Sequence, residues 1–157
     1  MKAALGLAAL FLLVSPVLGA DKPAVAIWTP AELKEREAKL SKTVGPDHSS
    51  RETLADYGHH RFRYLYRDAD GNPEQHDHIV DIVMVQSGEG TLVYGGTMVG
   101  KRGGGSAGEW LGTSLEGGER RPLAAGDVVH IPATIPHSFL VPKGKHITYV
   151  LVNFPSV

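Results

Sequence analysis

The feature that most constrains the fold is a series of short segments with the composition of β-strands, set between glycine and proline turns. In residues 59–67, aromatic residues alternate with arginines, which is typical of a strand with one buried face. Similar segments occupy residues 81–87, 91–96, 112–117, 120–124, 127–132, 137–142 and 146–154. Glycines predict turns at residues 88–90 and 117–118. With a single convincing helix elsewhere, this pattern predicts an all-β fold, an antiparallel sandwich or barrel.

The predicted helix spans residues 29–40 and precedes the strand-rich part. Thr29 is suited to cap the first turn, Pro30 suits the first helical position, and Glu32 completes a capping box. The apolar stripe of this helix is thin, which predicts a helix on the surface of a domain. The polar residues 41–56 are predicted to form a connector.

Residues 1–20 have the pattern of a secretory signal peptide, in which Lys2 precedes an uncharged apolar run that is short for a membrane span. A structural N-terminal helix is the alternative. The sequence therefore predicts a bacterial protein that is periplasmic or secreted, with a mature chain that begins near Asp21. The mature chain divides into an N-terminal arm, residues 21–56, and a barrel, residues 57–157.

The charges are nearly balanced, with 16 basic and 17 acidic residues in the chain, and removal of residues 1–20 takes away only Lys2. This balance gives no indication of a nucleic acid or a membrane surface as a partner. The chain has no cysteine, so an exported form can be neither held by disulfides nor anchored through a lipidated cysteine. We expect a homodimer, because a small barrel has exposed strand edges and the helix of residues 29–40 could lie across a partner's sheet.

Two stretches superficially resemble known ligand-binding loops. The calcium-loop interpretation of residues 68–74 fails because Pro73 stands where that loop needs a glycine. The glycine-rich residues 100–108 lack the order of a phosphate-binding loop, since Arg102 follows the lysine. We interpret this second stretch as a mobile hairpin loop, with a lid that has Trp110 at its base as the alternative.

Histidines and an aspartate gather in "EQHDHIVD", residues 74–81. His76 and His78 are two positions apart, so on one strand their side chains share a face. Asp81 lies three positions beyond His78, and it can join the histidines only if the chain bends or bulges at residues 79–80 and a new strand starts at Asp81.

A further histidine, His137, lies in "GDVVHIPATIPHSF", residues 126–139, where a proline-bounded turn joins two predicted strands. Two distant segments thus supply three histidines and a carboxylate. Neutral imidazoles with one carboxylate suit manganese, iron(II), nickel, copper or zinc, and an octahedral ion with four protein ligands keeps two positions open. The alternative is that these are solvated turn residues and a strand cap.

The two segments together resemble the two motifs of the cupin family. The first motif is matched in order by Gly71, His76, His78, Asp81 and Gly88, although Asp81 stands where the family has a glutamate and follows after only two residues. The second motif is matched by Gly126, Pro132 and His137, whereas Thr134 replaces a glycine and Val141 replaces an asparagine. The resemblance covers about residues 60–154, and an ordered pair of motifs is more specific than a lone His-x-His.

The resemblance implies a cupin-type double-stranded β-helix, a jelly-roll barrel, with one short N-terminal helix. It implies one divalent transition metal inside the barrel, bound by His76, His78, Asp81 and His137. Asp81 is one methylene shorter than the usual glutamate, so it reaches such a metal only after a local shift.

Four other residues are candidates for contact with a substrate or with the metal ligands. They are His130, Tyr64, Tyr66 and Tyr94. A surface position for the histidine and simple barrel packing for the tyrosines are the alternatives.

A metal with open positions in an apolar barrel can activate oxygen, polarise a substrate carbonyl or hold a ligand, and the fold does not choose between them. The first hypothesis is a metal-dependent oxidoreductase, of oxygenase or oxidase type, that acts on a small organic substrate. The alternatives are a non-catalytic cupin that binds or senses a small ligand, and a metal-assisted lyase or isomerase. A histidine or tyrosine inside the cavity would favour the last, because proton transfer needs a positioned acceptor.

Overall fold

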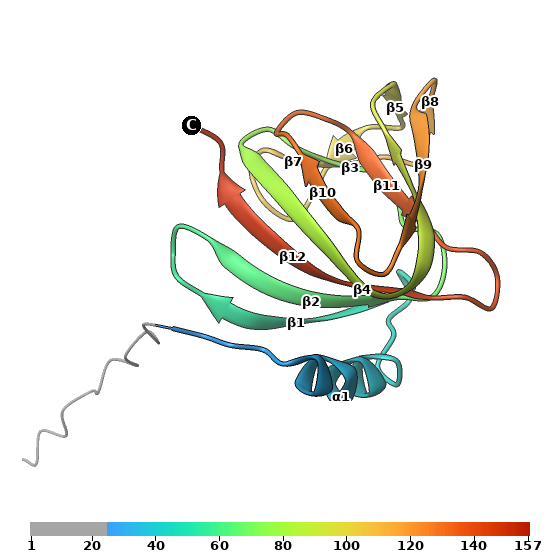
Figure 1. The fold of residues 1–157 in the computed structure, drawn as a ribbon. Helices are drawn as coiled ribbons and strands as arrows, with labels where there is room; N and C mark the ends of the chain where they lie inside the picture. The colour runs from blue at the N-terminus through green and yellow to red at the C-terminus, as the bar shows by residue number, and fades with distance from the viewer. Residues whose placement is uncertain (1–24) are drawn as a thin grey trace, which may run out of the picture.

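The computed structural model describes residues 25–157 (Figure 1), and the predicted signal peptide, residues 1–20, lies outside them. The elements in chain order are α1 (Pro30–Leu40), β1 (Ser49–Asp56), β2 (Arg61–Arg67), β3 (Glu74–His76), β4 (Ile79–Tyr94), β5 (Thr97–Val99), β6 (Arg102–Gly103), β7 (Glu109–Leu111), β8 (Ser114–Glu116), β9 (Glu119–Ala124), β10 (Val128–Ile131), β11 (His137–Leu140) and β12 (Ile147–Pro155). The predicted all-β class with one short helix is confirmed. Within the described part, the helix is too short and too polar to cross a membrane.

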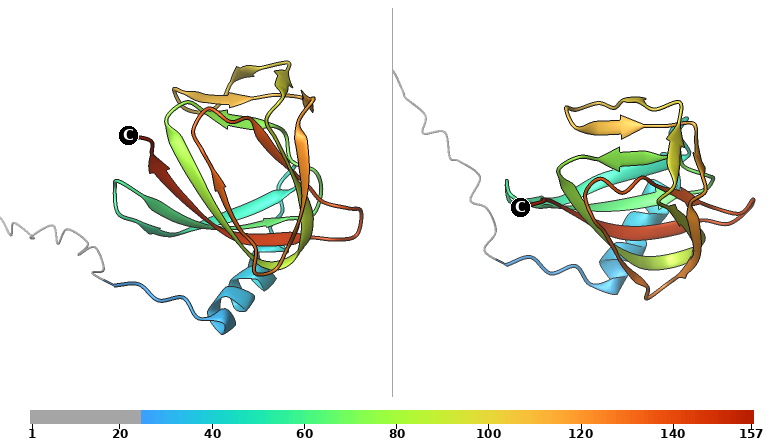
Figure 2. Two further views of the ribbon diagram at one scale, coloured as in Figure 1. Left: turned by 45° about the horizontal axis from the view of Figure 1, so that its top comes forward. Right: turned by 90° about the horizontal axis from the view of Figure 1, so that it is seen from above.

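Strand β4 belongs to both halves of the barrel. Its first half pairs with β12 and β10, and its second half pairs with β9 and β11, in each case antiparallel. Strand β2 lies beyond β12, and β1 lies beyond β2 at the edge of the sheet. The views in Figures 1 and 2 show these strands curving around a common interior, with α1 outside the barrel.

The turn predicted at residues 88–90 is wrong, because β4 continues through it. Gly88 has a φ of 72°, and a Cβ at this position would overlap the carbonyl oxygen of His146. The pairing with β12 also shifts by one residue just before this glycine, between Val85 and Ser87. The bulge and the glycine therefore bend the strand without ending its hydrogen bonding.

The connector predicted for residues 41–56 is also wrong from Ser49 onwards, since Ser49–Asp56 forms β1 and pairs with β2. Its polar composition conceals the strand, because β1 is an edge strand with few apolar side chains to bury. The sheet therefore begins earlier than residue 57.

Helix α1 covers the outer face of the sheet rather than a partner's sheet. Thr29 and Glu32 form the predicted capping box, in which each side chain accepts a hydrogen bond from the other's backbone N–H. The buried residues of this outer cluster are Leu33, Leu40, Tyr64 and Val150, and partly buried apolar side chains around them include Phe62 and Tyr66. The aromatic face of β2 is therefore the face beneath the helix.

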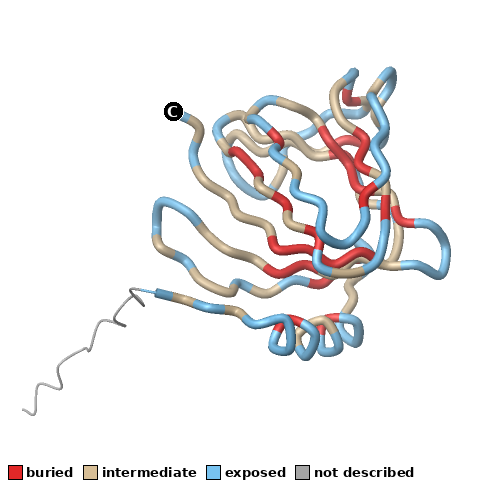
Figure 3. Tube along the Cα trace, viewed as in Figure 1, coloured by how far each residue is buried: buried red, intermediate tan, exposed pale blue. Residues whose placement is uncertain are grey.

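A second apolar cluster fills one end of the barrel, where Figure 3 shows buried segments of the walls. Its buried members are Leu65, Val83, Val85, Leu92, Leu123, Ile131, Phe139, Val141, Ile147 and Tyr149. The rings of Phe139 and Tyr149 stack with their centroids 5.0 Å apart. The close packing of this cluster makes one end of the interior rigid and fixes the strands that carry the polar side chains at the other end.

Candidate metal centre

Three strands bring candidate metal ligands together at the polar end of the interior. Glu74 and His76 lie two apart on β3, so they share a face, and His137 begins β11, which pairs with β3 at the register Glu74–His137. Ligand atoms of Glu74, His76 and His137 all lie within 4.8 Å of one another. This group could hold a metal ion.

Asp81 joins the same group from β4. Its Oδ2 lies 3.5 Å from Nε2 of His76 and 3.6 Å from Nε2 of His137, and the residue is 2% exposed. The chain bends at Asp77 and His78 rather than at residues 79–80, and β4 starts at Ile79. The new strand therefore turns Asp81 inward, as the bend predicted from the sequence requires.

The chemistry of His137 fits a metal ligand. Its Nδ1 lies 3.1 Å from the carbonyl oxygen of Ile135, and because a carbonyl only accepts, Nδ1 carries the proton. The buried Nε2 has no hydrogen-bond partner in residues 25–157, although a carboxylate oxygen of Glu74 lies 3.3 Å away. In the neutral ring this nitrogen offers a lone pair towards two carboxylates and a second histidine, which is the arrangement that a divalent ion satisfies.

The ionisation of the group shows how strongly its charges interact without a metal. Burial disfavours the charged form of Glu74, but its close pairing with His137 and the charges of His137, His76 and Arg67 lower the pKa of Glu74 to about 2. Burial alone would lower the pKa of His137, yet Glu74 and Asp81 raise it. Burial raises the pKa of Asp81 against the attraction of both histidines. A positive charge is thus favoured here, and a metal cation would replace the proton on His137.

The turn before β11 sets His137 beside β3. Thr134, at the position where the cupin motif has a glycine, has a φ of 70°, and its backbone N–H donates to the carbonyl oxygen of His76 over 2.7 Å. A β-branched residue with this φ is strained. The left-handed conformation is thus kept although the glycine is not.

The structure does not bring His78 into this group. His78 lies in the bend between β3 and β4 and is exposed, so it does not share a face with His76. The sequence reasoning missed Glu74 instead. The signal was available, because Glu74 and His76 are two apart on one strand.

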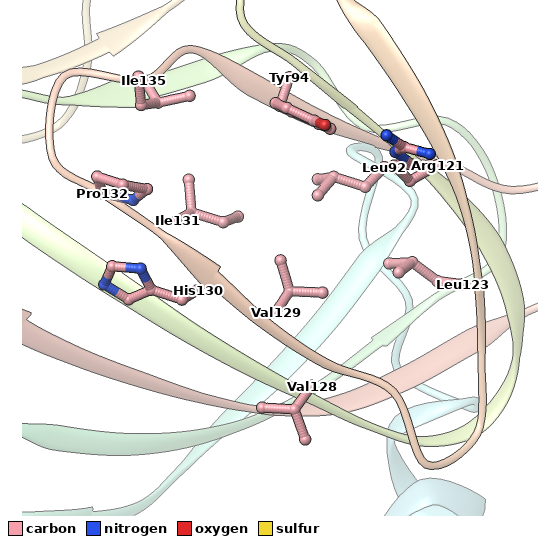
Figure 4. Close-up of a pocket in the computed structure, with 10 residues that line it drawn as sticks. All are labelled: Leu92, Tyr94, Arg121, Leu123, Val128, Val129, His130, Ile131, Pro132 and Ile135. Carbon is pink, nitrogen blue, oxygen red and sulfur yellow. The ribbon is translucent and has the colours of Figure 1, made fainter.

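Figure 4 shows that His130 and Tyr94 line a different, mostly apolar pocket between β4, β9 and β10. This pocket shares no lining residue with the cavity beside the metal centre. The Tyr94 hydroxyl donates to Glu119 over 2.8 Å. Tyr64 and Tyr66 lie under α1 on the outer face. None of these four predicted candidates therefore reaches the centre.

The cavity beside the centre has a volume of about 160 Å³. Its lining includes Glu74, His76 and Asp81, the acid Glu109, the phenol of Tyr149 and the amide of Asn153. Apolar side chains of Leu65, Ile79 and Leu151 also line it. Candidate metal ligands, groups able to transfer a proton and an apolar wall therefore meet at one small cavity.

The glycine-rich stretch forms a hairpin, as predicted, in which Arg102–Gly103 pairs with Glu109–Leu111. The Trp110 indole donates to Asp77 over 2.9 Å, and the Asp77 N–H donates to the carbonyl oxygen of Gly108 over 2.8 Å. The hairpin is thereby tied to the bend between β3 and β4. With Glu74 and His76, it lines a second opening beside the centre.

Comparison with known proteins supports the fold. No family model matches the chain, and no curated protein matches it. Among solved structures, an uncharacterised conserved protein with a double-stranded β-helix domain from Klebsiella pneumoniae has 16% identity and a TM-score of 0.52, over 71% of this chain and 80% of that one. A predicted oxalate decarboxylase from Thermotoga maritima has 15% identity and a TM-score of 0.51, over 69% and 81%.

The iron(II) form of HppE has 16% identity and a TM-score of 0.51, over 68% of this chain and 51% of that one, so this chain spans about half of its length. At these identities the likeness shows the fold alone. The chain has a double-stranded β-helix fold.

Proposed function

We propose that the chain binds one divalent transition metal through Glu74, His76 and His137, with Asp81 as a fourth ligand, and that it is a metal-dependent enzyme. The observation that carries this proposal is the buried, unpartnered Nε2 of His137 facing a second imidazole and two carboxylates. Without a metal this nitrogen has no hydrogen bond of good geometry and relies on ion pairs that form only when His137 is protonated, whereas metal binding satisfies it directly.

We further propose an oxidoreductase, of oxygenase or oxidase type, that acts on a small organic molecule in the adjoining cavity. Glu74, His76 and His137 are two histidines and one carboxylate, the ligand set of non-haem iron(II) oxygenases, and an octahedral ion that also takes Asp81 keeps two positions open for oxygen and substrate. Manganese and copper suit the same chemistry outside the cytoplasm, where iron(II) is harder to keep reduced. The protein's own part is to position the substrate and to exclude water with Leu65, Ile79 and Leu151.

A metal-assisted lyase or isomerase is the second candidate, because Tyr149 and Glu109 line the same cavity. Burial raises the pKa of Tyr149, so its phenol stays protonated and can act as a proton donor, while the carboxylate of Glu109 can accept a proton. A protein that only binds a ligand would not need this proton donor and acceptor, so the pair favours an enzyme over a binding protein.

The test is elemental analysis of the protein purified from its native compartment, followed by oxygen-electrode assays of the metal-loaded protein with phenols, dicarboxylates and sugars. His137→Ala should lower metal affinity about tenfold or more. His78→Ala, a matched histidine in the bend, should leave it unchanged. Equal metal content in both variants would exclude the site. Bound zinc without oxygen uptake would favour the lyase or isomerase, and a metal-loaded protein that turns over no substrate would favour a binding protein.

Export and assembly are separate proposals. We propose that the chain is periplasmic or secreted, which an intact Met1 in a cytosolic fraction, seen by mass spectrometry, would contradict. We also propose a homodimer, although α1 packs on its own sheet and is not free to cover a partner's. A monomer mass by light scattering at micromolar concentration would exclude it.

A further inference from the structure

The arginines of β2 face the barrel interior. Arg61, Arg63 and Arg67 alternate with the aromatic residues of this strand, and helix α1 covers the aromatic face. All three arginines line the cavity that also contains His76 and Asp81, and Arg51 of the neighbouring strand β1 lines it as well. Four guanidinium groups therefore surround one small, partly enclosed space.

These arginines lack acidic partners for the most part. Arg51 forms an ion pair with Asp47 at 3.0 Å, but Arg61, Arg63 and Arg67 form none with any residue of the described range 25–157. The Nε atoms of Arg61 and Arg67 are buried and have no hydrogen-bond partner there. Burial, and then the charges of Arg61 and Arg51, lower the pKa of Arg63, and the charges of Glu109 and Asp81 offset this only in part. The cations thus disfavour one another.

The charge of the cavity becomes positive once a metal is bound. Arg51 is paired with Asp47, so Arg61, Arg63 and Arg67 face three acids of the lining, Glu74, Asp81 and Glu109. A divalent metal at the centre would neutralise Glu74 and Asp81 and leave only Glu109 against the three arginines. Because unpaired charges in a poorly solvated site are costly, this arrangement indicates that an anion is the missing partner.

The register of the sheet places the positive group at a defined distance from the metal ligands. Arg61 is the Cα partner of Asn153, and Asn153 is the Cα partner of Asp81, so the three residues form one row across β2, β12 and β4. Adjacent strands lie about 4.8 Å apart, which puts Arg61 and Asp81 about 10 Å apart at the backbone. Directly opposite residues share a face of the sheet, so these three side chains all point into the cavity, and its volume of about 160 Å³ has room for a molecule of a few carbons.

We propose that the cavity binds a small organic dicarboxylate, with one carboxylate at the metal and the other held by Arg61 and Arg63. The proposal rests on the proposed metal centre and names its substrate class. Guanidinium groups bind carboxylates through paired, charge-assisted hydrogen bonds. The apolar side chains of Leu65, Ile79 and Leu151 suit the hydrocarbon that joins the two ends, and the small volume of the cavity excludes long chains.

The test measures binding of malonate, succinate and glutarate to the zinc-loaded protein by calorimetry, with metal content determined in parallel. Arg61→Gln and Arg63→Gln should each weaken binding of the best dicarboxylate at least about tenfold, because a charge-assisted hydrogen bond is lost, at unchanged metal content. Arg121→Gln is the matched control, since Arg121 is exposed and lies outside this cavity. Succinamide, which has the same shape without charge, should not bind.

A second readout does not depend on the choice of dicarboxylate. Arg63→Gln should raise the melting temperature in buffer without multivalent anions, because it relieves repulsion between neighbouring guanidinium groups. Retained metal with no binding of any of the three dicarboxylates, or with equal binding in the arginine variants, would overturn the dicarboxylate proposal and leave the metal centre intact. A wild-type protein that holds no metal would overturn the proposed function and this inference with it.

Discussion

Asn153 and Asp81 are directly opposite each other in the antiparallel pair of β12 and β4, and the Asn153 amide donates a hydrogen bond to Oδ1 of Asp81. The other oxygen, Oδ2, faces His76 and His137. Because one oxygen is held by the amide, the direction in which the second is offered to a metal is fixed. Asn153 would therefore position Asp81 as a ligand of the proposed metal.

Replacement of Asn153 by alanine tests this role. We expect Asn153→Ala to lower zinc affinity by about tenfold or more, as loss of a residue that orients a ligand does in other metal sites. Isothermal calorimetry measures the effect, and Asn72→Ala, at an exposed asparagine of a neighbouring loop, is the control. Equal affinity in the two variants would show that Asp81 needs no support.

Metal binding should strengthen as the pH rises. In the metal-free protein the pKa of His137 is raised above its usual 6.5, so the proton that stabilises its pairing with Glu74 is present below that value and is lost only as pH passes the higher folded pKa. A metal must displace this proton. The rise in melting temperature on adding zinc should therefore be larger at about pH 8 than at about pH 5.5, and calorimetry in buffers of different ionisation enthalpy should detect proton release.

The dependence of stability on pH in the acidic range follows from the lowered pKa of Glu74. Its pKa is lowered to about 2 from an ordinary 4.5, so its contribution to stability is present above 4.5 and is lost as the pH falls towards 2. The raised pKa of Asp81 acts in the opposite sense, because protonation of that buried carboxyl at low pH favours the folded state. In Glu74→Gln the loss of stability between these values should be smaller than in the wild type, measured by urea unfolding of metal-free protein. If both proteins lost the same stability between pH 4.5 and pH 2, Glu74 would not contribute to acid unfolding.

Thr134→Gly should stabilise the protein. The strain of a β-branched residue at a φ of 70° costs about 1–3 kcal/mol, which the substitution removes. The greater conformational entropy of glycine in the unfolded chain offsets about 0.5–1 kcal/mol of this gain in stability. The free energy of unfolding should rise by about 1 kcal/mol in urea titrations. Ala133→Gly, next to it at an ordinary φ, is expected to destabilise and serves as the control. A fall in both would mean that Thr134 is held without strain.

Leu33→Ala tests the attachment of helix α1 to the outer face of the sheet. Leu33 is 7% exposed and belongs to the cluster with Tyr64 and Val150, so its truncation should cost about 2–4 kcal/mol. Lys34→Ala, at an exposed position of the same helix, should change stability little. Should the two variants unfold at the same urea concentration, the helix would contribute nothing to the barrel.

Much of the candidate metal centre could be predicted from the sequence. His76, Asp81 and His137 follow from strand parity, a bend and the order of two motifs. His78 could not be placed correctly, because the position of the bend depends on contacts with the distant hairpin, where Asp77 bonds to Gly108 and Trp110. Local alternation holds no information about such a contact.

The orientation of β2 was beyond the sequence for a different reason. Alternation of Phe62, Tyr64 and Tyr66 with arginines shows that the strand has two unlike faces, but it does not say which one faces the barrel. The aromatic face is the outer one, because α1 supplies its apolar cover. The thin apolar stripe of this short helix did not predict that the helix would cover the aromatic face. If the helix did not cover that face, the aromatic side chains would be expected inside the barrel and the arginines in solvent.

Because β12 lies between β2 and β4, the sheet can be completed only after the C-terminal strand has been made. A polypeptide that emerges N-terminus first holds β1, β2 and β4 ready long before Ile147–Pro155 arrives to join them. Closure of the sheet therefore waits for contacts between residues far apart in the chain, and such closure is slow. Until then the edges of β2 and β4 that β12 covers stay unpaired and are open to wrong pairing with other strands.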